Sequence, residues 1–334
     1  MKILVVGGAG YIGSHAVKQL LEAHHQVVVV DSLETGYIAS LPEGVPFYHT
    51  DIRCKDTLKE VFLKENIQGV MHFAANSLVG ESMTNPLKYY ANNIGGAQVL
   101  LETMIECNVR YIVFSSTAAT YGDVMTMPIT EDTPTHPTNT YGETKLAIEK
   151  MLEWTSKAHD IHFVCLRYFN VAGASSSGLI GEAHQPETHL IPIILQVPLG
   201  QRPHISIYGD DYPTPDGTCI RDYIHVTDLI DAHILAMDYL TKGGKNDIFN
   251  LGSNTGYSVK EMVEAARKVT QHPIPVAIEE RRAGDPAILI ASSKKAQEIL
   301  GWAPKITDVE AIIESAWKWH HAHPQGYKRS ETHA

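Results

Sequence analysis

The stretch Gly7-Gly8-Ala9-Gly10-Tyr11-Ile12-Gly13 decides the fold. It follows the apolar run Ile3–Val6 directly and opens the segment Tyr11–Ala23, which has helical spacing. Glycines in such a turn let the backbone approach a pyrophosphate, whose charge the helix N-terminus stabilises. A glycine motif alone also fits an ordinary strand-to-helix turn. In this context we interpret it as a dinucleotide site whose contacts are Gly7, Gly10, Tyr11, Ile12 and Gly13.

Short apolar runs alternate with helical patterns along the first half of the chain. This alternation is typical of a parallel sheet covered by helices on both faces. We therefore predict an α/β fold, a doubly wound Rossmann sheet. The expected strands are Ile3–Val6, Val27–Val30, Gly69–His72, Tyr111–Phe114 and Phe163–Leu166, and further helices are expected at Leu58–Glu65, Tyr89–Cys107 and Tyr141–Ala158.

The composition changes after about Asn170, where Gly, Ser and Pro become frequent. We predict an NAD-binding Rossmann domain over residues 1–170 and a smaller α/β substrate-binding region over residues 171–330, with the chain crossing between the two. Short strands are expected in the second region at Asp247–Leu251 and Val276–Glu279. Capping boxes are predicted at Ser258 with Glu261, Thr307 with Glu310 and, in the first domain, Thr140 with Glu143.

Composition excludes several kinds of protein. The net charge is -11, and Lys and Arg form no blocks, which argues against nucleic acid as a partner. The four cysteines lie far apart without a CxxC, and no signal peptide or membrane-length apolar run is seen, so we expect a cytoplasmic protein without membrane contact. His320, His321 and His323 have no Cys or carboxylate partners nearby in sequence, and we predict no metal site.

Acidic and apolar residues at the ends of the predicted strands extend the dinucleotide site. Asp31 closes the second strand 18 residues (31 minus 13) after Gly13, where a carboxylate accepts ribose hydroxyls and repels a 2'-phosphate, although Asp is also a common turn residue. The sequence therefore favours NAD over NADP. Further cofactor contacts are expected at strand ends, at Ser32, Asp51, Ile52, Phe73, Ala74 and Ala75.

Tyr141 and Lys145 are spaced i, i+4, so on a helix both project from one face. A neighbouring ammonium would lower the phenol pKa from about 10, and the tyrosinate could then remove a hydroxyl proton while hydride leaves for nicotinamide. With 15 tyrosines the spacing alone is weak evidence, so its position counts. Thr117 or Ser116, at the end of the fifth strand, could bridge Tyr141 and the substrate oxygen; capping of the strand end is an equal alternative for Ser115 and Ser116.

With these motifs in view, the chain resembles the UDP-glucose 4-epimerases of the extended short-chain dehydrogenase/reductase superfamily from Met1 to about Tyr327. The matching segments include the glycine loop through Ser14-His15, Ser115-Ser116-Thr117 and Thr140-Tyr141-Gly142-Glu143-Thr144-Lys145. They continue with Arg167-Tyr168-Phe169-Asn170, His189-Leu190-Ile191-Pro192, Asp216-Gly217-Thr218, Arg221-Asp222-Tyr223-Ile224-His225-Val226 and Arg281-Arg282-Ala283-Gly284-Asp285.

The resemblance implies reversible inversion at C4 of a UDP-hexose, glucose to galactose, through a 4-keto sugar with NAD held throughout, as in galactose metabolism. It implies that Tyr141 is the base, that Thr117 bonds the C4 oxygen and that Lys145 lowers the Tyr141 pKa. It also implies a homodimer formed by helices near Tyr89–Cys107 and Tyr141–Ala158. With the cofactor we also place Asn92, Ser115, Tyr141, Lys145 and Tyr168, and with the substrate Thr117, Tyr141, Asn170, His189, Leu190, Tyr208, Arg221, Arg282 and Asp285.

The arginines have a structural alternative, because neighbouring Arg and Asp residues usually form surface ion pairs, here Arg282 with Asp285 or Arg221 with Asp222. Two departures from the family pattern are visible. Asn76-Ser77 stands where many members carry a lysine, which puts one ribose or phosphate contact in doubt. Ile288 stands where glucose-restricted members often carry a larger tyrosine, which predicts room for N-acetylated sugars.

Three other functions were weighed against this one. A 4,6-dehydratase is disfavoured because Ala118-Ala119 follows Thr117, where dehydratases typically carry an Asp-Glu pair. A 4-epimerase of another UDP-sugar, such as an N-acetylhexosamine, a pentose or a uronate, needs the same machinery. A non-catalytic NAD-binding protein is disfavoured by the intact Thr117, Tyr141 and Lys145.

Overall fold

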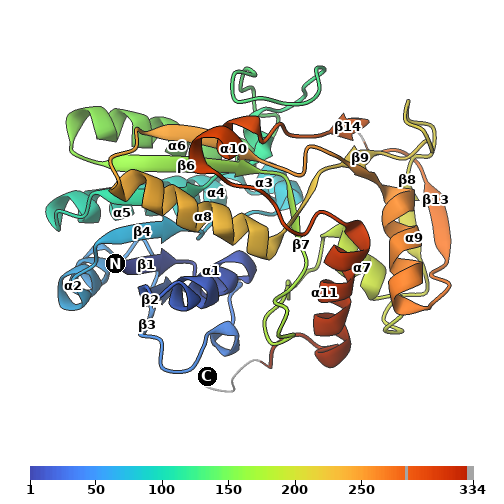
Figure 1. The fold of residues 1–334 in the computed structure, drawn as a ribbon, viewed down its shortest axis with the longest axis horizontal. Helices are drawn as coiled ribbons and strands as arrows, with labels where there is room; N and C mark the ends of the chain where they lie inside the picture. Colours follow the sequence, from blue (N-terminus) through green and yellow to red (C-terminus); the bar gives the residue numbers. More distant parts are fainter. Residues whose placement is uncertain (283–284, 329–334) are drawn as a thin grey trace.

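A seven-stranded parallel sheet forms the larger part of the molecule in the computed structural model, which describes residues 1–282 and 285–328 (Figure 1). The strand order is β11-β6-β5-β4-β1-β2-β3, and all pairings are parallel. The predicted Rossmann fold is therefore confirmed. The strands are β1 (Lys2–Val6), β2 (Gln26–Asp31), β3 (Phe47–His49), β4 (Gly69–His72), β5 (Tyr111–Ser115), β6 (His162–Tyr168) and β11 (Asp247–Leu251).

Two apolar clusters cover the two faces of this sheet. Successive residues of a strand point to opposite faces, and in β1 Ile3 and Val5 join one cluster while Leu4 and Val6 join the other. The strands are buried on both sides, as expected for a parallel sheet. The first face is covered by α1 (Tyr11–Glu22), α8 (Val226–Thr241) and α10 (Lys294–Leu300), and the second by α2 (Lys55–Glu65), α5 (Gly95–Glu106) and α6 (Thr140–Ala158).

A third apolar cluster lies outside the large sheet, among the elements at the right of Figure 1. It joins α7 (Leu190–Leu195), α9 (Val259–Thr270) and α11 (Val309–Ala322), beside the pair β8 (Ile205–Tyr208) and β13 (Val276–Glu279). Small pairs connect this part to the rest: β7 (Asn170–Ala172) with β10 (Tyr223–His225), and β9 (Ile220–Arg221) with β12 (Tyr257–Ser258) and β14 (Ile288–Leu289).

The segment Asp247–Leu251, expected among the C-terminal elements, instead pairs with β6 as the edge strand of the large sheet. Helix α8 also returns to that sheet. The chain thus leaves the sheet after β6 and comes back before its last helices. The limits of the two domains at residues 170 and 171 stay a prediction.

Helix boundaries depart from the sequence analysis by single residues. The box of Ser258 and Glu261 is confirmed, but Asn139 caps α6 in place of Thr140, and Asp308 caps α11 in place of Thr307. Asn and Asp accept more readily than Thr from the free N–H groups of a first turn, and each stands one residue earlier. The expected helix Tyr89–Cys107 is split into α4 (Pro86–Tyr89), a π-helical stretch η2 (Tyr90–Ile94) and α5.

The glycine loop is held by backbone crowding. Gly7 has φ +80, and a Cβ there would lie 2.5 Å from the Ala74 nitrogen. At Gly13 a Cβ would lie 2.1 Å from the Gly7 carbonyl oxygen, so the first turn of α1 can pack on the end of β1 only with glycine at this position. At Gly10 the nearest atom, again the Gly7 oxygen, would be 3.4 Å away, which is ordinary contact.

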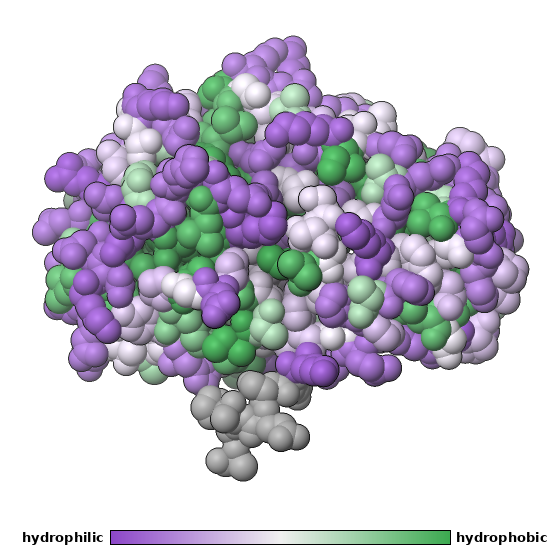
Figure 2. Space-filling model, turned by 60° about the horizontal axis from the view of Figure 1, so that its bottom comes forward, coloured by the Kyte–Doolittle hydropathy of each residue, from purple (hydrophilic) through white to green (hydrophobic). Residues whose placement is uncertain are grey.

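The surface seen in Figure 2 is mostly hydrophilic, with hydrophobic side chains in separate groups. Within residues 1–282 and 285–328 no helix has the length and apolar character needed to cross a membrane.

Gly13→Ala should lower the free energy of unfolding by about 1–3 kcal/mol, because a backbone oxygen must move to admit the methyl group. Denaturant unfolding followed by circular dichroism measures this. Gly10→Ala is the matched control, since its methyl group would face the same oxygen at contact distance. Equal stability of the two variants would contradict the crowding argument.

Candidate active site

A cavity of about 960 Å³ opens at the carboxyl ends of the sheet strands, where the glycine loop, α6 and the C-terminal part meet. Ligands of doubly wound sheets bind at this edge, beside the point where the strand order reverses, here between β1 and β4. Most predicted site residues line it: Gly7, Gly10, Tyr11, Ile12, Gly13, Asp31, Ser32, Asp51, Ile52, Phe73, Ala74, Ala75, Asn92, Thr117, Tyr141, Lys145, Tyr168, Asn170, His189, Tyr208 and Arg282.

Four predicted site residues are outside this lining. Ser115 is buried at the end of β5, where its hydroxyl contacts His233 Nε2 at 2.8 Å. Leu190 packs against the third apolar cluster. Arg221 and Asp285 form an ion pair with each other, as described below.

The cofactor side of the cavity is built from α1 and β2. Helix α1 begins after Gly10, and its first turn carries no charged side chain, so its free N–H groups and positive dipole end are available to an anion. Asp31 lies at the end of β2 and accepts hydrogen bonds from the nitrogens of Ala9 (2.9 Å) and Leu33 (2.8 Å). Burial raises the pKa of this carboxyl. The geometry fits a dinucleotide whose phosphates face α1 and whose ribose meets Asp31.

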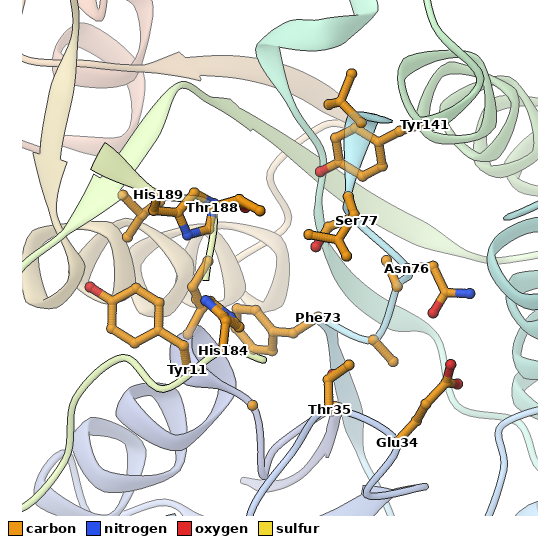
Figure 3. A pocket seen from close by; sticks show the side chains of 18 of the residues that line it. Tyr11, Glu34, Thr35, Phe73, Asn76, Ser77, Tyr141, His184, Thr188 and His189 are labelled. Carbon is orange, nitrogen blue, oxygen red and sulfur yellow. The ribbon is translucent and has the colours of Figure 1, made fainter. Parts of the chain in front are cut away.

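The loop after β4 is held by Asn93, which sequence reasoning missed. Asn93 Oδ1 accepts from the Asn76 nitrogen at 2.8 Å, and its Nδ2 donates to the Asn76 carbonyl and to Thr144 Oγ1, both at 3.0 Å. Asn93 is buried in η2, and this amide links the loop to α6. Asn76 and Ser77, which replace the family lysine, both line the cavity (Figure 3).

Tyr141 and Lys145 project from the first turns of α6 into the cavity, next to Thr117 after β5. The Lys145 ammonium donates to the Ser115 carbonyl at 2.7 Å and lies 6.0 Å from the centre of the Tyr141 ring. Burial raises the pKa of Tyr141 to about 12, opposed by a hydrogen bond with Thr117. Burial lowers the pKa of Lys145 to about 7, opposed by Glu149.

The expectation that Lys145 lowers the Tyr141 pKa is therefore wrong for this arrangement. A buried charge is costly, so the same environment favours the neutral form of both groups. The Lys145 ammonium is directed at a carbonyl oxygen. The hydroxyl of Thr117 is the group that favours the phenolate.

A buried ion pair fixes α6 one turn beyond Lys145. Arg167 Nε lies 2.9 Å from Glu149 Oε1 and its terminal nitrogen 2.5 Å from Oε2, with side chains only 5% and 3% exposed. Ser116 also donates to Glu149, at 2.5 Å. The Ser116 hydroxyl is thus used in packing, which leaves Thr117 as the hydroxyl facing the cavity. Sequence reasoning missed Glu149, whose partner is 18 residues away.

The opposite part of the cavity carries arginines. The Arg282 guanidinium stacks over the Tyr208 ring at 3.9 Å, and both residues line the cavity. Arg221 pairs with Asp285 at 2.9 Å, so neither ion pair weighed from sequence forms. Asp222 is buried, and its carboxylate accepts from Ser253 and from the Ala291 nitrogen. Ala283 and Gly284 of the same motif lie outside the described residues.

The expected position of Ile288 near the sugar needs correction. Ile288 lies in β14 opposite Ile220 of β9, and it does not line the cavity. Paired residues of neighbouring strands share a face of the sheet, so Leu289 shares the face of Arg221 and Ile288 the other face. The argument from Ile288 for N-acetylated sugars therefore fails, because its side chain points away from the Arg221 side.

Four ligand-type side chains converge at one wall of the cavity: Glu182, His184, Glu187 and His189. Figure 3 shows His184 and His189 beside Tyr11, across the cavity from Tyr141. Sequence reasoning placed only His189 in the site, and predicted no metal. The spacing E-x-H-x-x-E-x-H within eight residues was the signal that could have identified the group.

Comparisons with known proteins agree with this geometry. The model of the NAD dependent epimerase/dehydratase family matches residues 3–252. The chain is 58% identical to a UDP-glucose 4-epimerase of Halalkalibacterium halodurans, covering 98% of both chains. It resembles a crystal structure of a UDP-glucose 4-epimerase at 59% identity and TM-score 0.97, covering 98% of this chain and 100% of that one. It also resembles the Brucella ovis enzyme in complex with NAD, at 45% identity and TM-score 0.93, covering 95% and 97%.

Glu149→Gln should lower the free energy of unfolding by about 3–5 kcal/mol, because it leaves the buried Arg167 charge unpaired. Chemical denaturation measures the loss. Glu153→Gln is the control one turn further along α6, since Glu153 pairs with Lys157 on the surface and should change stability by less than about 1 kcal/mol. A similar small change in both variants would show that the buried pair does not stabilise the fold.

Proposed function

The chain belongs to the NAD dependent epimerase/dehydratase family, and from that premise we propose that it is a UDP-glucose 4-epimerase, which interconverts UDP-glucose and UDP-galactose with NAD as its cofactor. One observation carries the proposal. Thr117 and Tyr141 face the same cavity as the glycine loop, so a carbinol bound there meets a base and a dinucleotide together. Curated relatives and solved structures of the same activity support it along nearly the whole chain.

Tyr141 is assigned the proton transfer at the sugar. Its phenol accepts the proton of the C4 hydroxyl and later returns it, and Thr117 stabilises the phenolate by a hydrogen bond. Both side chains come from elements fixed by buried contacts, so they hold their positions without an added cost of ordering. When bound, NAD supplies the acceptor and donor of the hydride that moves at C4.

Lys145 is assigned a positioning role together with a contact to the nicotinamide ribose. Its ammonium donates to the Ser115 carbonyl, which fixes the end of β5 and with it the following Thr117. Binding of the cofactor is assigned to the glycine loop, to Asp31 and to the other predicted cofactor residues that line the cavity.

The UDP moiety is assigned to the C-terminal wall. Guanidinium groups bind diphosphate oxygens through paired N–H donors, and Arg282 is already oriented by the Tyr208 ring. Arg221, held by Asp285, presents a second guanidinium in the same part of the structure. Asn170, which donates to the Asp222 carbonyl, lies between this wall and Tyr141 in the sequence and lines the cavity.

A homodimer is proposed through the helices near residues 89–107 and 141–158. Large apolar side chains are exposed there, including Tyr90 and, at 69% exposure, Trp154 of α6. Exposed apolar groups on neighbouring helices are typical of a protein interface. The free cysteines agree with the cytoplasm as the proposed location.

Tyr141→Phe should lower turnover of UDP-galactose to UDP-glucose by about 10²–10⁴-fold, the range of a lost acid–base group, while NAD stays bound. Product separation measures turnover, and absorbance after denaturation measures NAD. Tyr111→Phe is the control, since Tyr111 lies at the opposite end of β5. Full activity of Tyr141→Phe would refute the assigned role, and inactive wild-type protein with bound NAD would support a binding protein instead.

Trp154→Glu should convert the dimer to a monomer in light scattering coupled to gel filtration, because a charge replaces an apolar contact at the interface core. Leu63→Glu on α2 serves as the control, since Leu63 is also exposed, at 59%, but lies outside the proposed surface. Dissociation by Leu63→Glu alone would place the interface elsewhere.

A further inference from the structure

We propose that Glu182, His184, Glu187 and His189 form a binding site for one divalent transition-metal cation, for which Zn²⁺ is the best match. The site is separate from the proposed chemistry at Tyr141 and lies in the loop that leads into α7. Each residue offers one ligand atom, and the four atoms lie within 4.8 Å of one another.

The distances between the ligand atoms match a tetrahedral site. His184 Nδ1 lies 3.0 Å from Glu182 Oε1 and 3.8 Å from Glu187 Oε2. His189 Nδ1 lies 2.5 Å from Glu182 Oε1 and 3.7 Å from Glu187 Oε1. Ligands bound at the usual zinc distances are about 3.3 Å apart in a tetrahedron, and the four separations scatter around that value.

Hydrogen bonding alone leaves this group incompletely satisfied. The Nδ1 atom of His184 is buried and makes no hydrogen bond of normal geometry, although Glu182 Oε1 is close. The same oxygen also faces His189 Nδ1. A buried nitrogen without a hydrogen bond is costly, and a cation between these atoms would accept the lone pairs of both imidazoles.

Charge also fits a divalent cation. The Glu182 and Glu187 side chains are only 4% and 7% exposed, and two carboxylates placed together out of water require two positive charges nearby. One M²⁺ with two neutral imidazoles meets this requirement. The alternative is a metal-free network in which both imidazoles are protonated, and the carboxylates do raise the pKa of His184 to about 10.

The carboxylates and the loop are held in place by further contacts. Glu187 Oε1 accepts from the nitrogens of Thr188 (2.8 Å) and His189 (2.9 Å), which orients it toward the cluster. The Glu182 carbonyl accepts from Trp319 Nε1 of α11 at 3.1 Å. Such outer contacts are typical of metal sites, where they fix the orientation of the ligands. The cation would therefore join the two ends of a loop that forms one wall of the cavity.

The ligand types select among metals. Two imidazole nitrogens with two carboxylate oxygens suit Zn²⁺ and related transition metals, whereas Ca²⁺ and Mg²⁺ require oxygen ligands alone. The four protein ligands would close a tetrahedral site, so the role assigned to the cation is structural.

The test uses the full-length chain without a polyhistidine tag, freed of metal with a strong chelator and then equilibrated with Zn²⁺. About one zinc per chain is expected by mass spectrometry of the metal content after removal of loosely bound ions. Co²⁺ in place of Zn²⁺ should give the intense visible absorption of a tetrahedral complex, and chelation should lower the melting temperature of the zinc-loaded protein.

Glu182→Gln and His184→Ala should each reduce zinc content at least about tenfold, with the loss of a ligand as the cause. The matched control is the double variant His321→Ala/His323→Ala, which removes two histidines of α11 that stack on tryptophans. It should keep the zinc. The Co²⁺ spectrum of the wild-type protein decides the matter if a variant fails to fold.

Two outcomes would overturn the proposal. Wild-type protein that retains no zinc and gives only the weak spectrum of octahedral Co²⁺ would favour the network of protonated imidazoles. Loss of zinc in the α11 control, with zinc retained by Glu182→Gln and His184→Ala, would place the metal at the helix. Neither result depends on epimerase activity, so the proposed function is judged separately.

Discussion

The position of α6 depends on charges buried between it and the ends of β5 and β6. Glu149 and Arg167 are paired almost without solvent, and Lys145 donates to a carbonyl at the end of β5 in the same region. An unpaired charge in this place would cost several kcal/mol, so the helix cannot slide or rotate without losing these contacts. Since Tyr141 and Thr117 are attached to these elements, their geometry is a consequence of the buried pair.

The same exclusion of water shapes the chemistry. Burial acts against the phenolate of Tyr141 and against the ammonium of Lys145, and it shifts their pKa values in opposite directions, to about 12 and about 7. A site that holds its base so rigidly therefore begins with the phenol protonated, and the Thr117 hydroxyl offsets only part of the shift. Rigidity and basicity oppose each other here, because both follow from the removal of water.

Local patterns predicted much of the fold and of the cofactor side. The glycine loop, the spacing of Tyr141 and Lys145 and the strand-end position of Asp31 all lie within a few residues of the element that positions them, so sequence order was sufficient. The pairs Glu149 with Arg167 and Arg221 with Asp285 join residues 18 and 64 positions apart, and they depend on which strands become neighbours. Cap positions were wrong by one residue because Thr140 and Thr307 each follow a better acceptor.

The two walls of the cavity solve one physical problem by different means. At α6, buried carboxylate and guanidinium groups come from elements of the large sheet, and the rest of the fold keeps them together. At the loop 182–189, four ligand groups come from eight neighbouring residues outside any strand, where backbone hydrogen bonds are few. A loop of this kind loses more conformational entropy on ordering than a strand end already fixed by its sheet, and a bound cation would supply the missing constraint. The convergence of these side chains is then explained by the need to hold a loop that the sheet does not reach.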